Sequence, residues 1–129
     1  MSTVTPPDAT LSLSIFHTFY GFLRRLAVVL DHVPKKSRYT LGAKIDTTSL
    51  DVFSLILRAN QARGEQRLAL LHETSVALDL LKILIRLAKD TKSLSETHYI
   101  LLQEPLQKTG KMLGGWIKNP EASRTKNPA

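Results

Sequence analysis

Hydrophobic residues recur at alternating spacings of four and three along most of this chain. An α-helix completes a turn every 3.6 residues, so this spacing lines the apolar side chains along one helix face. The pattern predicts four helices, over residues 11–31, 36–62, 65–91 and 93–118. Because short connections between long helices imply antiparallel neighbours, we expect an all-α fold, an up-down-up-down antiparallel four-helix bundle.

The residues expected in the core share this spacing in each segment. They are Ile15, Phe19, Phe22, Leu26, Val29 and Val33, then Leu41, Ile45, Thr48, Val52, Leu55 and Ala59, then Leu71, Leu78, Leu81, Ile85 and Ala88, and finally Leu102, Leu106, Leu113 and Trp116. The third segment adds a second stripe, made of Leu70, Ala77, Leu80, Leu84 and Leu87. Three neighbouring helices leave part of such a segment uncovered, so we expect the chain to form a homo-oligomer.

Turn and cap residues mark the expected helix ends. Pro34 should end the first helix, because proline disfavours helix in the residue before it, and Gly64 marks the next turn. Ser93 followed by Glu96 predicts a capping box at the start of the last helix. Pro105 lies inside that helix and should kink or break it, since proline removes a backbone hydrogen bond.

The 129 residues fit one domain with a single core. We expect a flexible lead-in at residues 1–10, the bundle at 11–118 and a disordered basic tail at 119–129, because neither end carries an apolar stripe. The longest uncharged stretch, residues 9–23, is too short and polar to cross a membrane, and the first ten residues lack the basic start of a secretory signal. We therefore expect a cytoplasmic protein without a membrane partner.

The residues that usually carry chemistry are sparse. The chain has no cysteine, which excludes a disulfide framework, a thiolate zinc site and a cysteine nucleophile. Its four histidines occur singly in the sequence, at His17, His32, His72 and His98. A di-iron bundle needs inward carboxylates and Glu-x-x-His motifs, whereas the inward positions here are apolar. We therefore expect no catalytic residue, no metal and no cofactor, and interpret the protein as a non-enzyme.

Basic residues are better organised, and they give the chain a formal net charge of +7. Two clusters stand out: Lys35, Lys36, Arg38 and Lys44 at the start of the second helix, and Lys82, Arg86 and Lys89 on the third. The second cluster follows helical spacing, and only Asp79 is placed to relieve its repulsion. The clusters are typical either of a surface that binds nucleic-acid phosphates or of an ordinary solvated helix face.

Glycines gather near the end of the last helix. Gly110 and Gly114 form a G-x-x-x-G step, and Gly115 precedes Trp116. Glycine destabilises a helix interior by about 1 kcal/mol relative to alanine, so this group predicts close approach by another helix or a helix end. In the first case Gly110, Gly114 and Trp116 would form an oligomer or partner interface, with the indole as an anchor.

Three segments are informative in combination: Pro34-Lys35-Lys36-Ser37-Arg38-Tyr39-Thr40-Leu41-Gly42, the run from Leu80 to Asp90, and the run from Gly110 to Lys118. Together they resemble the accessory variability determinant (Avd) proteins of diversity-generating retroelements, within an S23-like four-helix-bundle group that includes proteins encoded in ribosomal RNA genes. The resemblance covers about residues 16–118. The departure from the family pattern is Pro105, since we expect family members to run the last helix without a break.

The resemblance implies a homopentamer that associates with a reverse transcriptase and its template RNA, and that supports adenine-directed mutagenic copying. It implies no catalytic residue, and its matching basic positions are Arg38, Lys82 and Arg86. Our leading hypothesis is therefore a reverse-transcriptase accessory protein whose basic surface binds RNA and possibly DNA. The alternatives are an S23-like ribosomal-RNA-associated protein and a structural oligomeric adaptor that does not bind nucleic acid.

Overall fold

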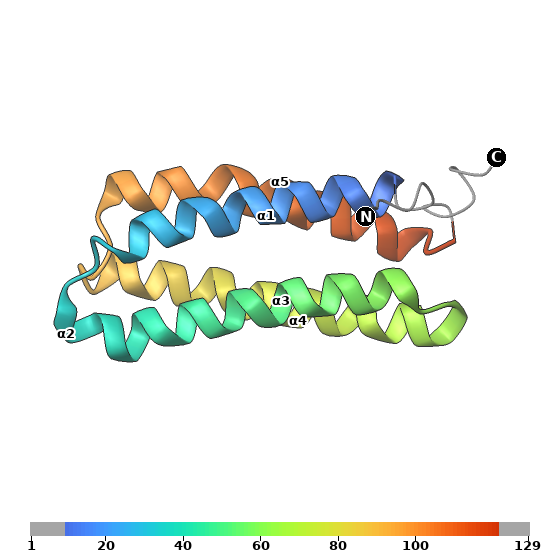
Figure 1. Cartoon of the computed structure of the whole chain (residues 1–129), viewed down its shortest axis with the longest axis horizontal. Helices are drawn as coiled ribbons and strands as arrows, with labels where there is room; N and C mark the ends of the chain where they lie inside the picture. The colour runs from blue at the N-terminus through green and yellow to red at the C-terminus, as the bar shows by residue number, and fades with distance from the viewer. Residues whose placement is uncertain (1–9, 122–129) are drawn as a thin grey trace, which may run out of the picture.

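The computed structural model describes residues 10–121, and all regular structure in that range is helical. The elements are α1 (Thr10–Leu30), α2 (Lys35–Ser37), η2 (Arg38–Gly42), α3 (Ala43–Gln61), α4 (Gly64–Asp90) and α5 (Glu96–Lys118). Figure 1 shows α1, α3, α4 and α5 side by side, each starting at the end of the bundle where the previous long helix finished. The prediction of an all-α four-helix bundle is confirmed.

The core contains the residues that the hydrophobic spacing predicted. Every residue of the four predicted stripes is buried except Leu41, which is partly exposed at the edge of the core. α3 packs most extensively on α4, and α1 on α5. Residues 1–9 of the predicted lead-in and 122–129 of the predicted tail lie outside the described residues.

The second predicted helix has a different first turn from the one expected. It begins with α2, widens into the π-helical turn η2 and continues as α3. Arg38 Nη2 lies 3.3 Å from Asp31 O and 3.2 Å from Val33 O, so its guanidinium donates to carbonyls at the end of the α1 segment. Gly42 is buried in the same turn, and a Cβ there would lie 3.4 Å from Ser37 O and 3.7 Å from Leu30 Cδ2. The π-helical turn is thus held by contacts with the end of the α1 segment.

The predicted capping box at Ser93 is wrong. The N-cap of α5 is Ser95, whose hydroxyl accepts from His98 N at 3.1 Å. Ser93 belongs instead to the turn that closes α4, where its N–H donates to Ala88 O at 2.9 Å. This turn places Lys92 in the left-handed region at φ 66°, a position where glycine is usual.

The predicted break at Pro105 is wrong, because α5 is continuous from Glu96 to Lys118. Proline has no N–H to donate to the carbonyl four residues earlier, which is that of Leu101. Arg25 of α1 supplies the missing donor, with its Nη1 2.7 Å from Leu101 O. Arg25 Nη2 also lies 3.4 Å from Glu104 Oε1. A side chain from a neighbouring helix therefore replaces the lost helical bond.

This replacement predicts energetic coupling between Arg25 and Pro105. Arg25→Met should lower the free energy of unfolding by about 1 kcal/mol, because Leu101 O loses its donor. In a Pro105→Ala background the same change should have a smaller effect, since the N–H of the new alanine bonds Leu101 O. Urea unfolding of the two single variants and the double variant measures the coupling. Equal effects in both backgrounds would contradict it, and Arg24→Met serves as the control for loss of a neighbouring charge.

Candidate nucleic-acid and partner interface

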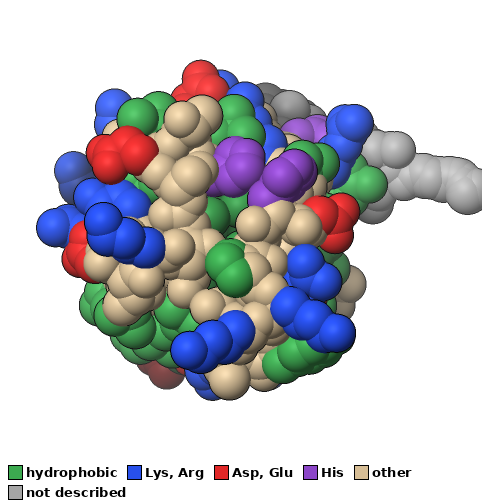
Figure 2. Space-filling view, turned by 90° about the vertical axis from the view of Figure 1, so that its left-hand side faces the viewer, with side chains coloured by type: hydrophobic (Ala, Val, Ile, Leu, Met, Phe, Trp, Pro, Cys, Tyr) green, Lys and Arg blue, Asp and Glu red, His purple; other side chains and the backbone are tan. Residues whose placement is uncertain are grey.

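Both predicted basic clusters reach the same end of the bundle. The α1–α3 connection and the α4–α5 connection meet there (Figure 1), and a hydrogen bond of 2.9 Å joins Ser37 Oγ to Ser93 Oγ. Figure 2 views this end directly and shows Lys and Arg side chains in groups around its rim. We call it the basic end, defined by Lys35, Lys36 and Arg38 from α2 and η2, by Arg86 and Lys89 near the end of α4, and by Lys92 from the α4–α5 connection. Sequence spacing alone did not join these groups.

The lysines of α2 are accessible cations at the basic end. Lys35 and Lys36 are exposed, and neither forms an ion pair with any residue in the range 10–121. Lys44, the second residue of α3, is also exposed. Arg38 differs, because its guanidinium bonds carbonyls at the end of the α1 segment. The lysines are thus available to a polyanion, whereas the arginine mainly holds the turn.

The cations on α4 are partly neutralised. Arg86 Nε lies 3.2 Å from both carboxylate oxygens of Asp90, and this hydrogen bond, followed by the carboxylate's negative charge, raises the pKa of the Arg86 guanidinium. Lys89 Nζ lies 3.9 Å from Asp90 Oδ1 and 4.7 Å from the centroid of the Tyr99 ring. Sequence reasoning named Asp79 as the relieving acid. That was wrong, because Asp90 is four residues after Arg86 and faces it across one turn.

Lys82 and most of the predicted glycine–tryptophan interface contact other residues of this chain. A Cβ at Gly110 would lie 3.1 Å from Lys82 Nζ, so this glycine opens space for the lysine between α4 and α5. Trp116 is only 6% exposed and belongs to the core. Gly114 is exposed, and a Cβ there would meet no other atom within 4 Å. Of the three residues, only Gly114 is open to a partner in this arrangement.

Arg67 is an interacting residue that sequence reasoning missed. Its side chain is fully buried, with Nε 3.0 Å from both Ala59 O and Ala62 O, and Nη2 3.1 Å from Asn60 O. Nη1 donates to Pro120 O at 2.8 Å, and the guanidinium lies 5.7 Å from the Trp116 ring centroid. The sequence did indicate that this side chain is buried, because Arg67 precedes Leu71 by four residues and so continues the core spacing of the third segment toward its start.

Two histidines that occur singly in the sequence also meet near the basic end. The rings of His32 and His98 have centroids 5.1 Å apart. His32 Nδ1 lies 2.9 Å from Val28 O, which orients that ring.

Among the described residues, no group of three His, Asp or Glu side chains could hold a metal ion. None of the helices in this range is long and apolar enough to cross a membrane.

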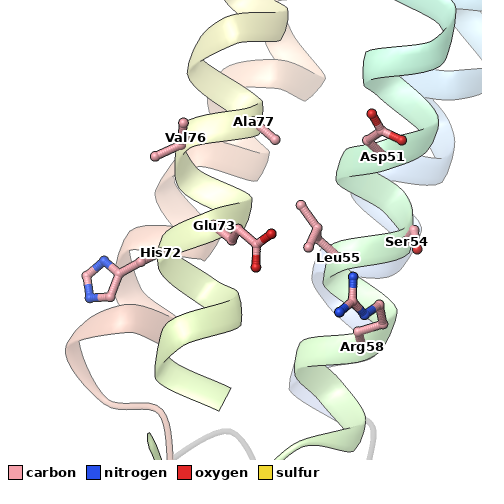
Figure 3. A pocket seen from close by; sticks show the side chains of 8 residues that line it. All are labelled: Asp51, Ser54, Leu55, Arg58, His72, Glu73, Val76 and Ala77. Carbon is pink, nitrogen blue, oxygen red and sulfur yellow. The ribbon is translucent and has the colours of Figure 1, made fainter. Parts of the chain in front are cut away.

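An apolar stripe lies on the solvent side of α4. Val76, Leu80, Ile83 and Leu87 follow four-three-four spacing and are between 42% and 70% exposed. A groove of about 570 Å³ lies between α3 and α4 and meets this stripe at Val76. Figure 3 shows Glu73 and Leu55 directed into the space between these helices, whereas His72 points away. We call the stripe formed by Val76, Leu80, Ile83 and Leu87 the α4 face.

The Arg67 contacts predict a large loss of stability on substitution. Arg67→Met should lower the free energy of unfolding by about 3 kcal/mol, because several buried carbonyls lose their donors. Arg63→Met, an exposed position one turn earlier, should change it by less than about 0.5 kcal/mol. Urea unfolding followed by circular dichroism measures both, and the single Trp reports the change around its ring. Equal stability of the two variants would show that the network contributes nothing.

Residues 14–120 match a protein-family model described as bAvd-like. The match begins inside α1 and ends just beyond α5, so it includes the basic end and the α4 face. No curated protein and no solved structure matches the chain. The resemblance that the three sequence segments indicated is therefore confirmed over nearly the whole described region. The chain belongs to the bAvd-like family.

Proposed function

We propose that this protein is the non-catalytic accessory factor of a diversity-generating retroelement. In this proposal it binds the reverse transcriptase and the template RNA, or its RNA–DNA hybrid, and supports mutagenic copying in the cytoplasm. Membership of the bAvd-like family supports the accessory role. The polymerase supplies the chemistry, so the accessory chain needs no catalytic residue and no cofactor.

The observation that carries the proposal is the meeting of two separate lysine-bearing connections at the basic end. Lysines on a compact surface attract phosphates and release bound counterions, which gives affinity that falls as salt rises. Such contacts position a nucleic acid without reading its sequence. The free ammonium groups of Lys35 and Lys36 suit this role better than Arg86, whose charge is already paired with Asp90.

The α4 face supports self-association. Soluble surfaces usually expose apolar side chains singly, whereas this stripe exposes four in a row along one helix. Contiguous apolar patches commonly mark interaction sites. We propose that this face packs against a second copy of the chain in a closed assembly, a pentamer by the resemblance to Avd proteins. The same stripe would serve a structural oligomeric adaptor equally well, so nucleic-acid binding is the property that separates the two functions.

Changing Lys35 and Lys36 together to Glu should weaken RNA binding about tenfold or more at low salt. The slope of log affinity against log salt should fall by about 2, because two phosphate contacts are lost. Lys108→Glu with Lys111→Glu on α5 changes the net charge equally and is the matched control. Fluorescence anisotropy over a salt series measures both pairs. If both pairs weaken binding equally, the effect comes from net charge and not from the basic end. An affinity that does not depend on salt would favour the structural oligomeric adaptor.

Ile83→Glu should dissociate the assembly, because it places a charge in the proposed apolar contact. Ile100→Glu is the matched control, since Ile100 on α5 is 61% exposed and Ile83 on α4 is 64% exposed. Size-exclusion chromatography with light scattering gives the subunit number of each variant. A single subunit for the unaltered protein, or equal behaviour of the two variants, would contradict the α4 face as the contact.

Gene position separates the remaining alternative. A reverse-transcriptase gene next to the gene for this chain supports the proposal. A position inside a ribosomal RNA gene would favour the S23-like ribosomal-RNA-associated function instead.

A further inference from the structure

Tyr39 has an unusual surface position at the basic end. It is 71% exposed, the largest exposure among the large hydrophobic side chains described in residues 14–121. Its ring makes no aromatic or cation–π contact with any residue in that range. Tyr20, by contrast, stacks on Phe16 with centroids 6.2 Å apart, and Tyr99 lies under Lys89. Most of the Tyr39 side chain is therefore accessible to a ligand.

Two lysines precede Tyr39 in the same helical run. Lys35 and Lys36 precede Tyr39 by four and three residues, which places all three on one side of the helical turn. Arg38 does not cover the ring, because its guanidinium is directed to Asp31 O and Val33 O. An exposed aromatic side chain alone indicates little. Combined with two unpaired lysines on the same side, it forms a surface with both a stacking plane and phosphate-binding charges.

The backbone beneath Tyr39 is well supported. The residue belongs to the π-helical turn η2, and π turns recur at functional sites although their hydrogen bonds are poorer. Thr40 Oγ1 donates to Ser37 O at 3.2 Å, and Gly42 packs closely against the end of the α1 segment. The ring is thus displayed from an ordered turn, which lowers the entropy lost when a ligand stacks on it.

The neighbouring connection supplies a further cation. Lys92 adopts φ 66°, although glycine occupies this helix-terminal position without strain. Its neighbour Ser93 bonds Ser37, which lies beside Lys36 in the chain. Local strain of this kind is retained at functional sites more often than elsewhere. The turn therefore places a lysine next to the connection that carries Tyr39.

We infer that the basic end is a site for single-stranded nucleic acid, with one unpaired base stacked on Tyr39. The flanking phosphates meet Lys35 and Lys36, and Lys92 contacts the strand as it continues. This inference rests on the proposed nucleic-acid binding and adds the form of the ligand. A duplex holds its bases inside the stack, so it can use the lysines but not the ring, whereas a single strand can use both.

The test uses the full chain and two labelled probes, a 12-nucleotide oligouridylate RNA and a 12-base-pair RNA duplex. Tyr39→Ala should weaken binding of the single strand about tenfold, as expected for loss of one stacked base, and change duplex binding less than twofold. Tyr39→Phe should bind both probes as the unaltered protein does, because the ring is kept. Tyr20→Ala, an exposed tyrosine on α1 outside the basic end, is the matched control and should change neither affinity.

The outcomes separate this inference from the broader proposal. If the Lys35 and Lys36 double variant loses both probes while Tyr39→Ala binds them normally, the stacking site is wrong and the phosphate-binding surface stands. Equal weakening of both probes by Tyr39→Ala would also overturn the stacking site. If the unaltered protein binds neither probe, both are wrong. A deoxyuridylate strand of equal length shows whether the site depends on the 2′-hydroxyl; circular dichroism confirms that each variant is folded.

Discussion

The buried guanidinium of Arg67 is the interaction on which one end of this bundle depends. A charge removed from water strongly destabilises a fold unless it is hydrogen-bonded. Arg67 meets this condition by donating to carbonyls at the end of α3 and, across 53 residues, to Pro120. It also lies over Trp116. The connection between α3 and α4 is thereby bound to the end of α5, and neither can shift without exposing unpaired carbonyls.

Arginine and lysine have different uses throughout the molecule. Arg25, Arg38 and Arg67 all donate to main-chain carbonyls, where the planar guanidinium offers several donors at once. Lys35 and Lys36 remain in solvent without an ion pair among the described residues. Part of the basic content therefore holds the fold together, and the lysines of the basic end remain available to a partner. Net charge alone indicates a polyanion partner but not the surface that would bind it.

The helical segments could be predicted because their information is local. A spacing of four and three determines which side of each helix is apolar, and the main stripe of each helix is buried except at Leu41. In the second stripe of α4 only Leu70 is buried, and Leu80 and Leu87 are exposed. The basic clusters were visible for the same reason. Their meeting at one end was not, because it depends on where two connections fold. Arg86 and Asp90 are four residues apart on one helix, so their ion pair could have been predicted from the sequence.

By itself, the sequence determined that the chain forms four amphipathic helices with more apolar surface on α4 than the other helices cover, and that cations outnumber acids. Only the tertiary structure decided how local rules were overridden. Pro105 continues its helix because Arg25, 76 residues before Leu101, bonds the Leu101 carbonyl that proline leaves free. Ser93 bonds Ser37 rather than capping α5. Both outcomes depend on hydrogen bonds between distant residues, and hydrophobic spacing carries no information about those until the helices pack.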